Sequence, residues 1–155
     1  MLDALAALRA PGTAMVHQVG IVVADLDAAV AEHSRLRGCT PADWRLDVFG
    51  PGSVEELTVR GEPAEYTARL AFHGAGPELE LIQPLDGPSV YAGCLGLHHL
   101  AIVVTSLEEA VAAMEHAGFT TLQAGRGFAP VGRGGFAYFD TTTALGYLLE
   151  AVELP

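Results

Sequence analysis

Two stretches of sequence decide the fold: HQVGIVVADLDAAVA at residues 17–31 and HHLAIVVTSLEEAVA at residues 98–112. They align without a gap, and eight of the fifteen positions are identical. An aliphatic chain can share Ile-Val-Val by chance, but matching flanks on both sides are much harder to obtain that way. A repeat at a fixed offset indicates related structural units. We therefore predict one domain over residues 1–155, built from two modules at about 13–87 and 95–155.

Each copy of the repeat predicts a strand followed by a helix. The β-branched runs at 19–23 and 100–104 are typical of buried strands. Asp25 and Ser106 then occupy N-cap positions, and the apolar spacing predicts helices at about 26–36 and 107–117. Gly38 and Gly118 stand where helices usually end.

The segments after each helix predict strands. In the first half we expect them at about 42–49, 54–60, 64–73 and 77–83, with one of the first two alternatively a loop; in the second, at about 119–124, 134–140 and 145–153. The glycines of 125–135 predict a long hairpin loop, which we interpret as a flap. One helix cannot cover each sheet. The predicted class is α+β: two tandem βαβββ modules forming a curved, cup-shaped mixed sheet with helices outside.

Composition narrows the possible partners. The chain has 19 acidic residues against 8 basic ones, all arginine, for a net charge of −11. Nucleic acids and anionic membranes both require basic surfaces, so we expect neither as a partner. Cys39 and Cys94 are too few for a disulfide framework. The first ten residues resemble an amphipathic turn or helix rather than a signal peptide, and we expect a cytoplasmic protein.

Four polar residues occupy matched places in the two halves. Gln18 and His99 lie on the first strands, and Glu80 and Glu150 lie within apolar last strands. A carboxylate there costs several kcal/mol unless it is paired, protonated or bound to metal. This donor set suits Zn, Ni, Co, Mn or Fe(II). The alternative is that the glutamates face solvent and that His99 is a structural residue.

The neighbouring histidines leave a second alternative open. Strand alternation turns His17 and His98 away from the face that carries Gln18 and His99. A bulge of one residue in the first strand would bring His17 into the site in place of Gln18.

The repeat, together with ELIQP at 80–84 and LEAVE at 149–153, resembles the vicinal oxygen chelate superfamily over about residues 15–153. This superfamily includes glyoxalase I, methylmalonyl-CoA epimerase, extradiol dioxygenases, and fosfomycin and bleomycin resistance proteins. Within the superfamily, the sequence pattern of this chain, including GLHHLA at 96–101, is most similar to that of the epimerase. The resemblance implies paired βαβββ modules with a metal in a shared cup, and it carries the four metal positions onto Gln18, Glu80, His99 and Glu150. Gln at the first position is similar to glyoxalase I.

For function, the resemblance implies a metal-dependent isomerase, epimerase or lyase that acts on a small carbonyl substrate through a metal-stabilised enolate. Glu150 would be base and ligand, with Glu80 second. The epimerase's second catalytic carboxylate falls on the strand at 66–72, where the nearest acid is Glu65. A CoA substrate is not favoured by a lysine-free chain, in which Arg126 and Arg133 are the obvious anion-binding candidates.

Two other functions stay open. The first is a non-enzymatic binding protein for an antibiotic or metabolite. Its pocket would be lined by Trp44, Phe72, Tyr91, Arg126, Phe128, Phe136 and Tyr138. The second is an extradiol dioxygenase, which normally needs two histidines and one carboxylate. A homodimer is compatible with the fold, although no residue specifies it.

Overall fold

The computed structural model describes residues 8–155. These form a ten-stranded mixed sheet in the order β2-β5-β6-β1-β7-β10-β9-β8-β3-β4. The strands are β1 (Gln18–Val22), β2 (Arg45–Phe49), β3 (Val54–Val59), β4 (Glu62–Pro63), β5 (Thr67–His73), β6 (Glu78–Asp86), β7 (Gly96–Val103), β8 (Thr121–Phe128), β9 (Arg133–Phe139) and β10 (Leu148–Glu153). The helices are α2 (Leu26–Arg37), η1 (Pro41–Asp43), α3 (Leu107–His116) and α4 (Thr142–Leu145).

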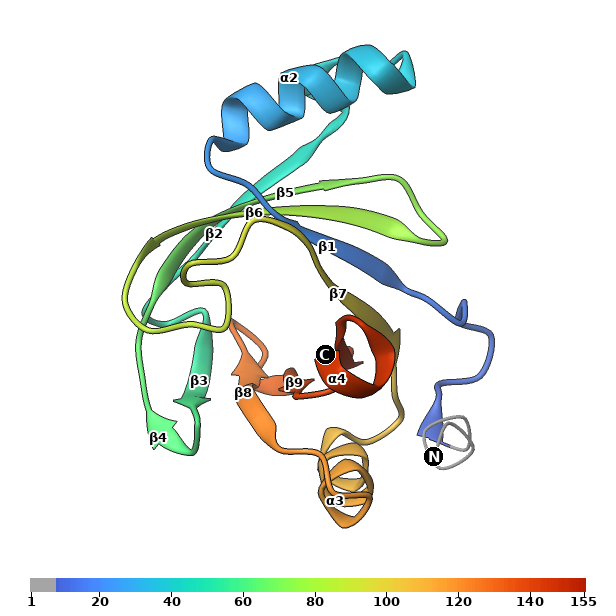
Figure 1. The fold of residues 1–155 in the computed structure, drawn as a ribbon, viewed down its shortest axis with the longest axis vertical. Coiled ribbons are helices and arrows are strands. Elements are labelled where there is room, and N and C mark those ends of the chain that lie inside the picture. The colour runs from blue at the N-terminus through green and yellow to red at the C-terminus, as the bar shows by residue number, and fades with distance from the viewer. Residues whose placement is uncertain (1–7) are drawn as a thin grey trace.

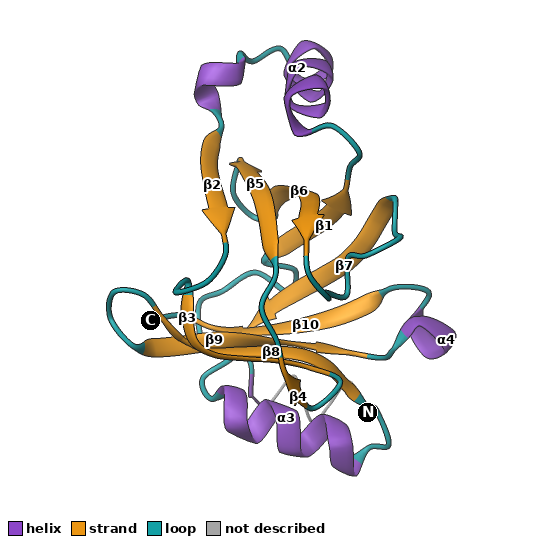
Figure 2. Cartoon of the chain, turned by 90° about the vertical axis from the view of Figure 1, so that its left-hand side faces the viewer, coloured by secondary structure: helices purple, strands orange, loops and turns teal. Residues whose placement is uncertain are grey.

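The two halves of the sheet meet at β1 and β7, which pair antiparallel. Val19 pairs with Leu100, its own equivalent in the repeat, so a pseudo-twofold axis passes through that pair. Strands β1, β6, β5 and β2 lie on one side, and β7, β10, β9 and β8 lie on the other. Helices α2 and α3 lie on the outer surfaces of the two halves (Figures 1 and 2). The predicted fold class, a curved mixed sheet with helices outside, is confirmed.

The predicted caps define where the two long helices begin. The Asp25 side chain accepts a hydrogen bond from Ala28 N at 3.0 Å, and the Ser106 side chain accepts one from Glu109 N at 3.2 Å. Each therefore satisfies a backbone donor that the helix itself cannot pair. Helix α2 ends at Gly38, whose φ of 70° is left-handed and favours glycine.

The hairpin of β3 and β4 crosses from the first half to the second. Both uncertain segments, 42–49 and 54–60, contain strands, but they separate in space. Strand β2 pairs with β5 of its own half, whereas β3 pairs with β8 of the other half. The first half therefore contributes an extra edge to the second half-sheet.

The glycine-rich segment 125–135 belongs mostly to strands, so the prediction of a long loop was wrong. Strand β8 continues to Phe128 and β9 begins at Arg133, leaving residues 129–132 as the connection. Gly125 pairs with Phe136, and a Cβ at Gly125 would overlap the phenyl ring of Phe136. The glycine therefore permits close packing within a strand rather than a loop.

The core has two outer clusters and one inner cluster. Leu26, Leu79 and Leu81 pack beneath α2, whereas Leu107, Met114 and Phe139 pack beneath α3. The third cluster, on the inner face, contains the buried tyrosines and Ile82. The outer faces of β6 and β9 thus pack against the helices, while the inner face combines apolar and aromatic side chains with a few buried polar ones.

Little of the N-terminal amphipathic segment can be compared with its prediction, because residues 1–7 lie outside the described part. Arg9 forms an isolated antiparallel bridge with Val104. Within residues 8–155, no helix combines the length and apolarity needed to cross a membrane.

Candidate metal centre

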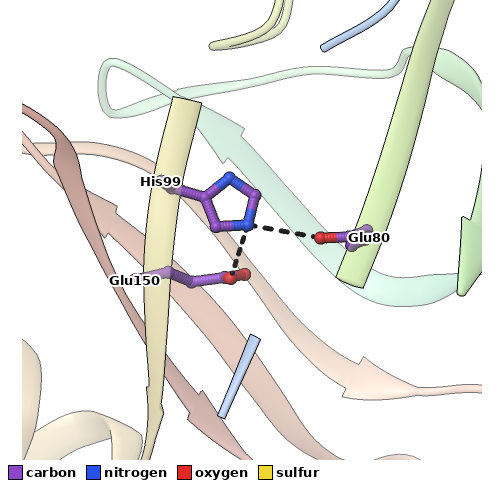
Figure 3. Close-up of side chains that lie close together, drawn as sticks. All are labelled: Glu80, His99 and Glu150. Carbon is purple, nitrogen blue, oxygen red and sulfur yellow. Dashed lines mark ion pairs between the residues drawn. The ribbon is translucent and has the colours of Figure 1, made fainter. Parts of the chain in front are cut away.

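Three ionisable side chains converge on the inner face: Glu80 from β6, His99 from β7 and Glu150 from β10. His99 Nε2 lies 3.2 Å from Glu80 Oε2 and 3.3 Å from Glu150 Oε2. Figure 3 shows both carboxylates reaching the same ring nitrogen. His99 is fully buried, and the two glutamates are 7% and 4% exposed. The pseudo-twofold axis thus brings Glu80 and Glu150, from equivalent places in the repeat, to one imidazole.

Gly20 on β1 provides the space for that imidazole. Gly20 pairs with Glu80 on one side and with His99 on the other. A Cβ at residue 20 would overlap the His99 ring. Sequence reasoning missed this residue, although a glycine inside an apolar strand is a known signal of close approach.

Gln18 lies on the same wall, and its amide nitrogen is already engaged. Gln18 Nε2 donates to Glu78 Oε2 at 2.7 Å. The amide oxygen is therefore the atom that can act as a metal ligand. His17 and Gln18 both border a cavity at the site, so both alternatives for the fourth ligand lie near the three converging residues.

His98 does not point away from the site, and that expectation was wrong. The pairing of β1 with β7 shifts register: Gly20 pairs with His99, but Ile21 pairs with Leu97. His98 is the extra residue of this bulge, and bulges re-aim side chains. Its buried ring lies next to His99, with the two Nδ1 atoms 3.0 Å apart.

The three residues fit a bound divalent cation. Among residues 8–155, the buried side-chain atoms that lack a hydrogen-bond partner are His99 Nε2 and Glu150 Oε2. Buried polar atoms normally have a partner, and leaving one unpaired costs about 1–3 kcal/mol. One imidazole nitrogen and two carboxylate oxygens that face one another are suitable ligands for a transition metal. A cation between them would partner both atoms.

Without a metal, burial and neighbouring charges shift the pKa values of the ionisable groups in the site. Burial raises the pKa of Glu150 to about 7, although the nearby His99 opposes this rise. Burial lowers the pKa of His99, but the charges of Glu150 and Glu80 outweigh it and raise the pKa overall. Burial lowers the pKa of His98 to about 4. Glu150 and His99 therefore hold their protons more tightly than exposed residues do, and a bound cation would displace those protons.

A cavity of about 720 Å³ opens beside the three residues. Of the predicted pocket residues, Phe72, Tyr91, Phe128, Phe136 and Tyr138 line this cavity. Trp44 and Arg126 are not among its lining residues. Trp44 lies beneath α2, where its indole nitrogen donates to Ser34 Oγ at 2.8 Å.

Three buried tyrosines, Tyr66, Tyr91 and Tyr138, form a polar wall of the cavity. The hydroxyls of Tyr91 and Tyr138 lie 2.6 Å apart. Burial raises the pKa of all three phenols, so they remain protonated donors at neutral pH. Tyr66 was not predicted to line the pocket. It borders the same cavity as Glu80, whereas its neighbour Glu65 is exposed and lines only a smaller pocket.

The sequence matches a family model described as the glyoxalase/bleomycin resistance protein/dioxygenase superfamily over residues 17–139. The chain therefore belongs to this superfamily, which agrees with the resemblance of its repeat. No curated protein matches the sequence.

Solved structures share the fold at low sequence identity. A hypothetical protein from Bacillus halodurans is 20% identical with a TM-score of 0.59, over 90% of this chain and 94% of the other. Methylmalonyl-CoA epimerase from Mycobacterium tuberculosis is 23% identical with a TM-score of 0.57, over 94% and 93%. A Streptomyces coelicolor methylmalonyl-CoA epimerase variant in complex with 2-nitronate-propionyl-CoA is 18% identical with a TM-score of 0.57, over 92% and 98%. These likenesses establish the architecture.

Proposed function

We propose that this protein is a metal-dependent isomerase, epimerase or lyase that moves a proton next to the carbonyl group of a small substrate. The observation that carries the proposal is the convergence of Glu80, His99 and Glu150, two of whose buried atoms lack partners, beside a large cavity. A divalent cation held by these residues, with Gln18 as a further ligand, would stabilise negative charge on a carbonyl oxygen as a Lewis acid.

Glu150 is the proposed base. Its carboxylate borders the cavity among the candidate metal ligands, where it would accept a proton from a bound substrate and return it. Glu80 is the second carboxylate of the site. The residue just before β5 is a phenol, Tyr66, rather than a further carboxylate, and a protonated phenol can donate to a substrate oxygen.

The cavity lining favours a substrate without phosphate groups. Arg45 and His17 are the basic residues that border the cavity among residues 8–155. Arg45 already packs 3.9 Å from the centre of the Phe72 ring and lies 3.6 Å from a Glu78 oxygen. A polyphosphate normally requires several cationic or backbone donors. We therefore propose a small carbonyl compound rather than a CoA ester.

Metal content and proton exchange test this proposal. Purified protein should contain about one equivalent of a transition metal, measured by inductively coupled plasma mass spectrometry. The Glu80→Ala/Glu150→Ala double variant should lose it, whereas Glu62→Ala, at an exposed site on β4, should keep it. Metal-loaded protein should then exchange the α-hydrogens of a matching small carbonyl compound for deuterium, and Glu150→Gln should abolish that exchange. Absence of binding after loading with Zn, Ni, Co, Mn or Fe(II) would refute the mechanism.

A binding protein is the second candidate, and the aromatic character of the cavity favours it. Phe49, Tyr66, Phe72, Tyr91, Phe128, Phe136 and Tyr138 all border the cavity. Stoichiometric ligand binding without metal or turnover would support this function. An iron-dependent extradiol dioxygenase is less favoured, because the converging group contains one histidine and two carboxylates.

A further inference from the structure

The imidazole of His98 lies between the candidate ligand His99 and the segment that connects the two halves. His98 Nε2 is 3.0 Å from the backbone oxygen of Val90, and His98 Nδ1 is 3.0 Å from His99 Nδ1. His98 is only 7% exposed, and the bulge in β7 turns its ring toward His99. Both ring nitrogens of His98 are therefore engaged by the protein.

The geometry determines where the hydrogens lie. A carbonyl oxygen only accepts hydrogen bonds, so His98 Nε2 must carry the hydrogen in its contact with Val90. In a neutral ring, Nδ1 of His98 is then an acceptor. Two facing nitrogens share one hydrogen, and that hydrogen must therefore belong to Nδ1 of His99.

We propose that His98 is a positioning residue that fixes a hydrogen on Nδ1 of His99, so that Nε2, which faces Glu80 and Glu150, is the nitrogen that a metal would bind. This inference rests on the proposed metal centre. Nε2 is the atom of His99 that lacks a hydrogen-bond partner, and it lies between the two carboxylates where a cation would sit. A metal-binding histidine generally needs such a partner on its other nitrogen to set its tautomer.

The connecting segment, residues 87–95, is itself held in place. Val90 N donates to Gln123 Oε1 at 3.0 Å, and Gln123 Nε2 donates to the Tyr66 hydroxyl at 3.2 Å. Gln123 is only 1% exposed. Val90 is thus anchored through its N–H, and its carbonyl is fixed at His98. The chain of contacts from Tyr66 to His99 ties the tautomer of the ligand to the packing of the connection.

Nitrogen-15 NMR of the imidazole rings tests the tautomer directly in unmodified protein. In metal-free protein at neutral pH, His98 should carry a hydrogen at Nε2 and none at Nδ1, and His99 should carry one at Nδ1. The His98→Asn variant assigns the signals. A hydrogen on Nδ1 of His98 would overturn the proposal. This measurement needs no metal, so it stands whether or not the proposed function fails.

Two variants test the consequence for metal binding. The His98→Asn change keeps an acceptor near the position of Nδ1, whereas His98→Leu has a similar size and none. The zinc dissociation constant, measured by competition with a chelator, should rise about 10–100-fold in His98→Leu. It should stay within about a few fold of wild type in His98→Asn. Equal losses of zinc affinity in both variants would mean that His98 acts only through packing. Wild-type protein that binds no zinc would refute the metal centre, and NMR would then decide the tautomer alone.

Discussion

At the scale of single residues, the site depends on an absence of side chain. Gly20 lies between Glu80 and His99 in the sheet, and its missing Cβ leaves the volume that the imidazole fills. The same residue brings two ligands from different halves within reach of each other. A methyl group there would compete directly with His99 for space.

The Gly20→Ala variant should therefore lose metal affinity by at least about tenfold, because His99 must leave its position, and should unfold more easily by about 1–3 kcal/mol from overpacking. Chelator competition and denaturant unfolding measure the two effects. Gly50→Ala is the matched control, since a Cβ at Gly50 would have ordinary contacts with Thr67, 3.7 Å and 3.9 Å away. Unchanged affinity in Gly20→Ala would mean that His99 is not held as described.

At the scale of elements, each long helix is joined to the last strand of its half by one side chain. Glu153 on β10 accepts a hydrogen bond from Leu107 N at 2.7 Å, and Gln83 on β6 accepts one from Leu26 N at 3.3 Å. The two contacts occupy equivalent places in the repeat. Each satisfies a backbone N–H at the first turn, where the helix dipole also favours negative charge. This fixes α3 to the strand that carries Glu150.

Replacing Glu153 with alanine should destabilise the protein by about 1–2 kcal/mol, because a charged acceptor is lost from a partly buried helix N-terminus. Gln83→Ala should have a similar cost, since it removes a weaker contact with Leu26 N but also the hydrogen bond that Gln83 Nε2 donates to Ala24 O at 3.1 Å. Denaturant unfolding compares both with Glu108→Ala, an exposed residue in the first turn of α3. If Glu153→Ala costs no more than Glu108→Ala, the contact does not stabilise α3.

The elements also show how far the sequence could predict the molecule. The repeat located both long helices, their N-caps and the strand that carries His99, and the apolar pattern of later segments located the strands of Glu80 and Glu150, because periodicity and capping are local signals. The bulge that turns His98 inward could not be predicted, since it depends on the register between β1 and β7. The pairing of β3 with β8 is likewise a contact between distant segments.

At the scale of the whole molecule, the two halves share one polar centre. Glu80 comes from the first half, and His99 and Glu150 come from the second. Two carboxylates and an imidazole in a buried place are costly unless they hold protons or a cation. The stability of the entire sheet should therefore respond to pH and to metal.

In metal-free protein, the contribution of Glu150 to stability should fall as pH rises from about 4.5 to 7. Over that range the unfolded chain releases the Glu150 proton, whose ordinary pKa is 4.5, while the folded protein keeps it up to a pKa of about 7. At this carboxyl the folded state binds more protons, so its contribution to the free energy of unfolding falls with pH, by up to about 3 kcal/mol. The raised pKa of His99 acts in the same direction above its ordinary value of 6.5.

The lowered pKa of His98, about 4, acts in the opposite direction between about 4 and 6.5, so the contribution of Glu150 is measured as a difference between wild type and Glu150→Gln. In denaturant unfolding with chelator, Glu150→Gln should gain stability relative to wild type as pH rises from about 4.5 to 7, whereas Glu62→Gln on exposed β4 should follow wild type. Added metal should reverse the trend, because the cation displaces the protons that the site holds and binds more tightly as pH rises. The same two carboxylates that weaken the metal-free fold above neutral pH would then join its halves. A difference in stability between wild type and Glu150→Gln that does not change with pH would place the responsible proton elsewhere in the molecule.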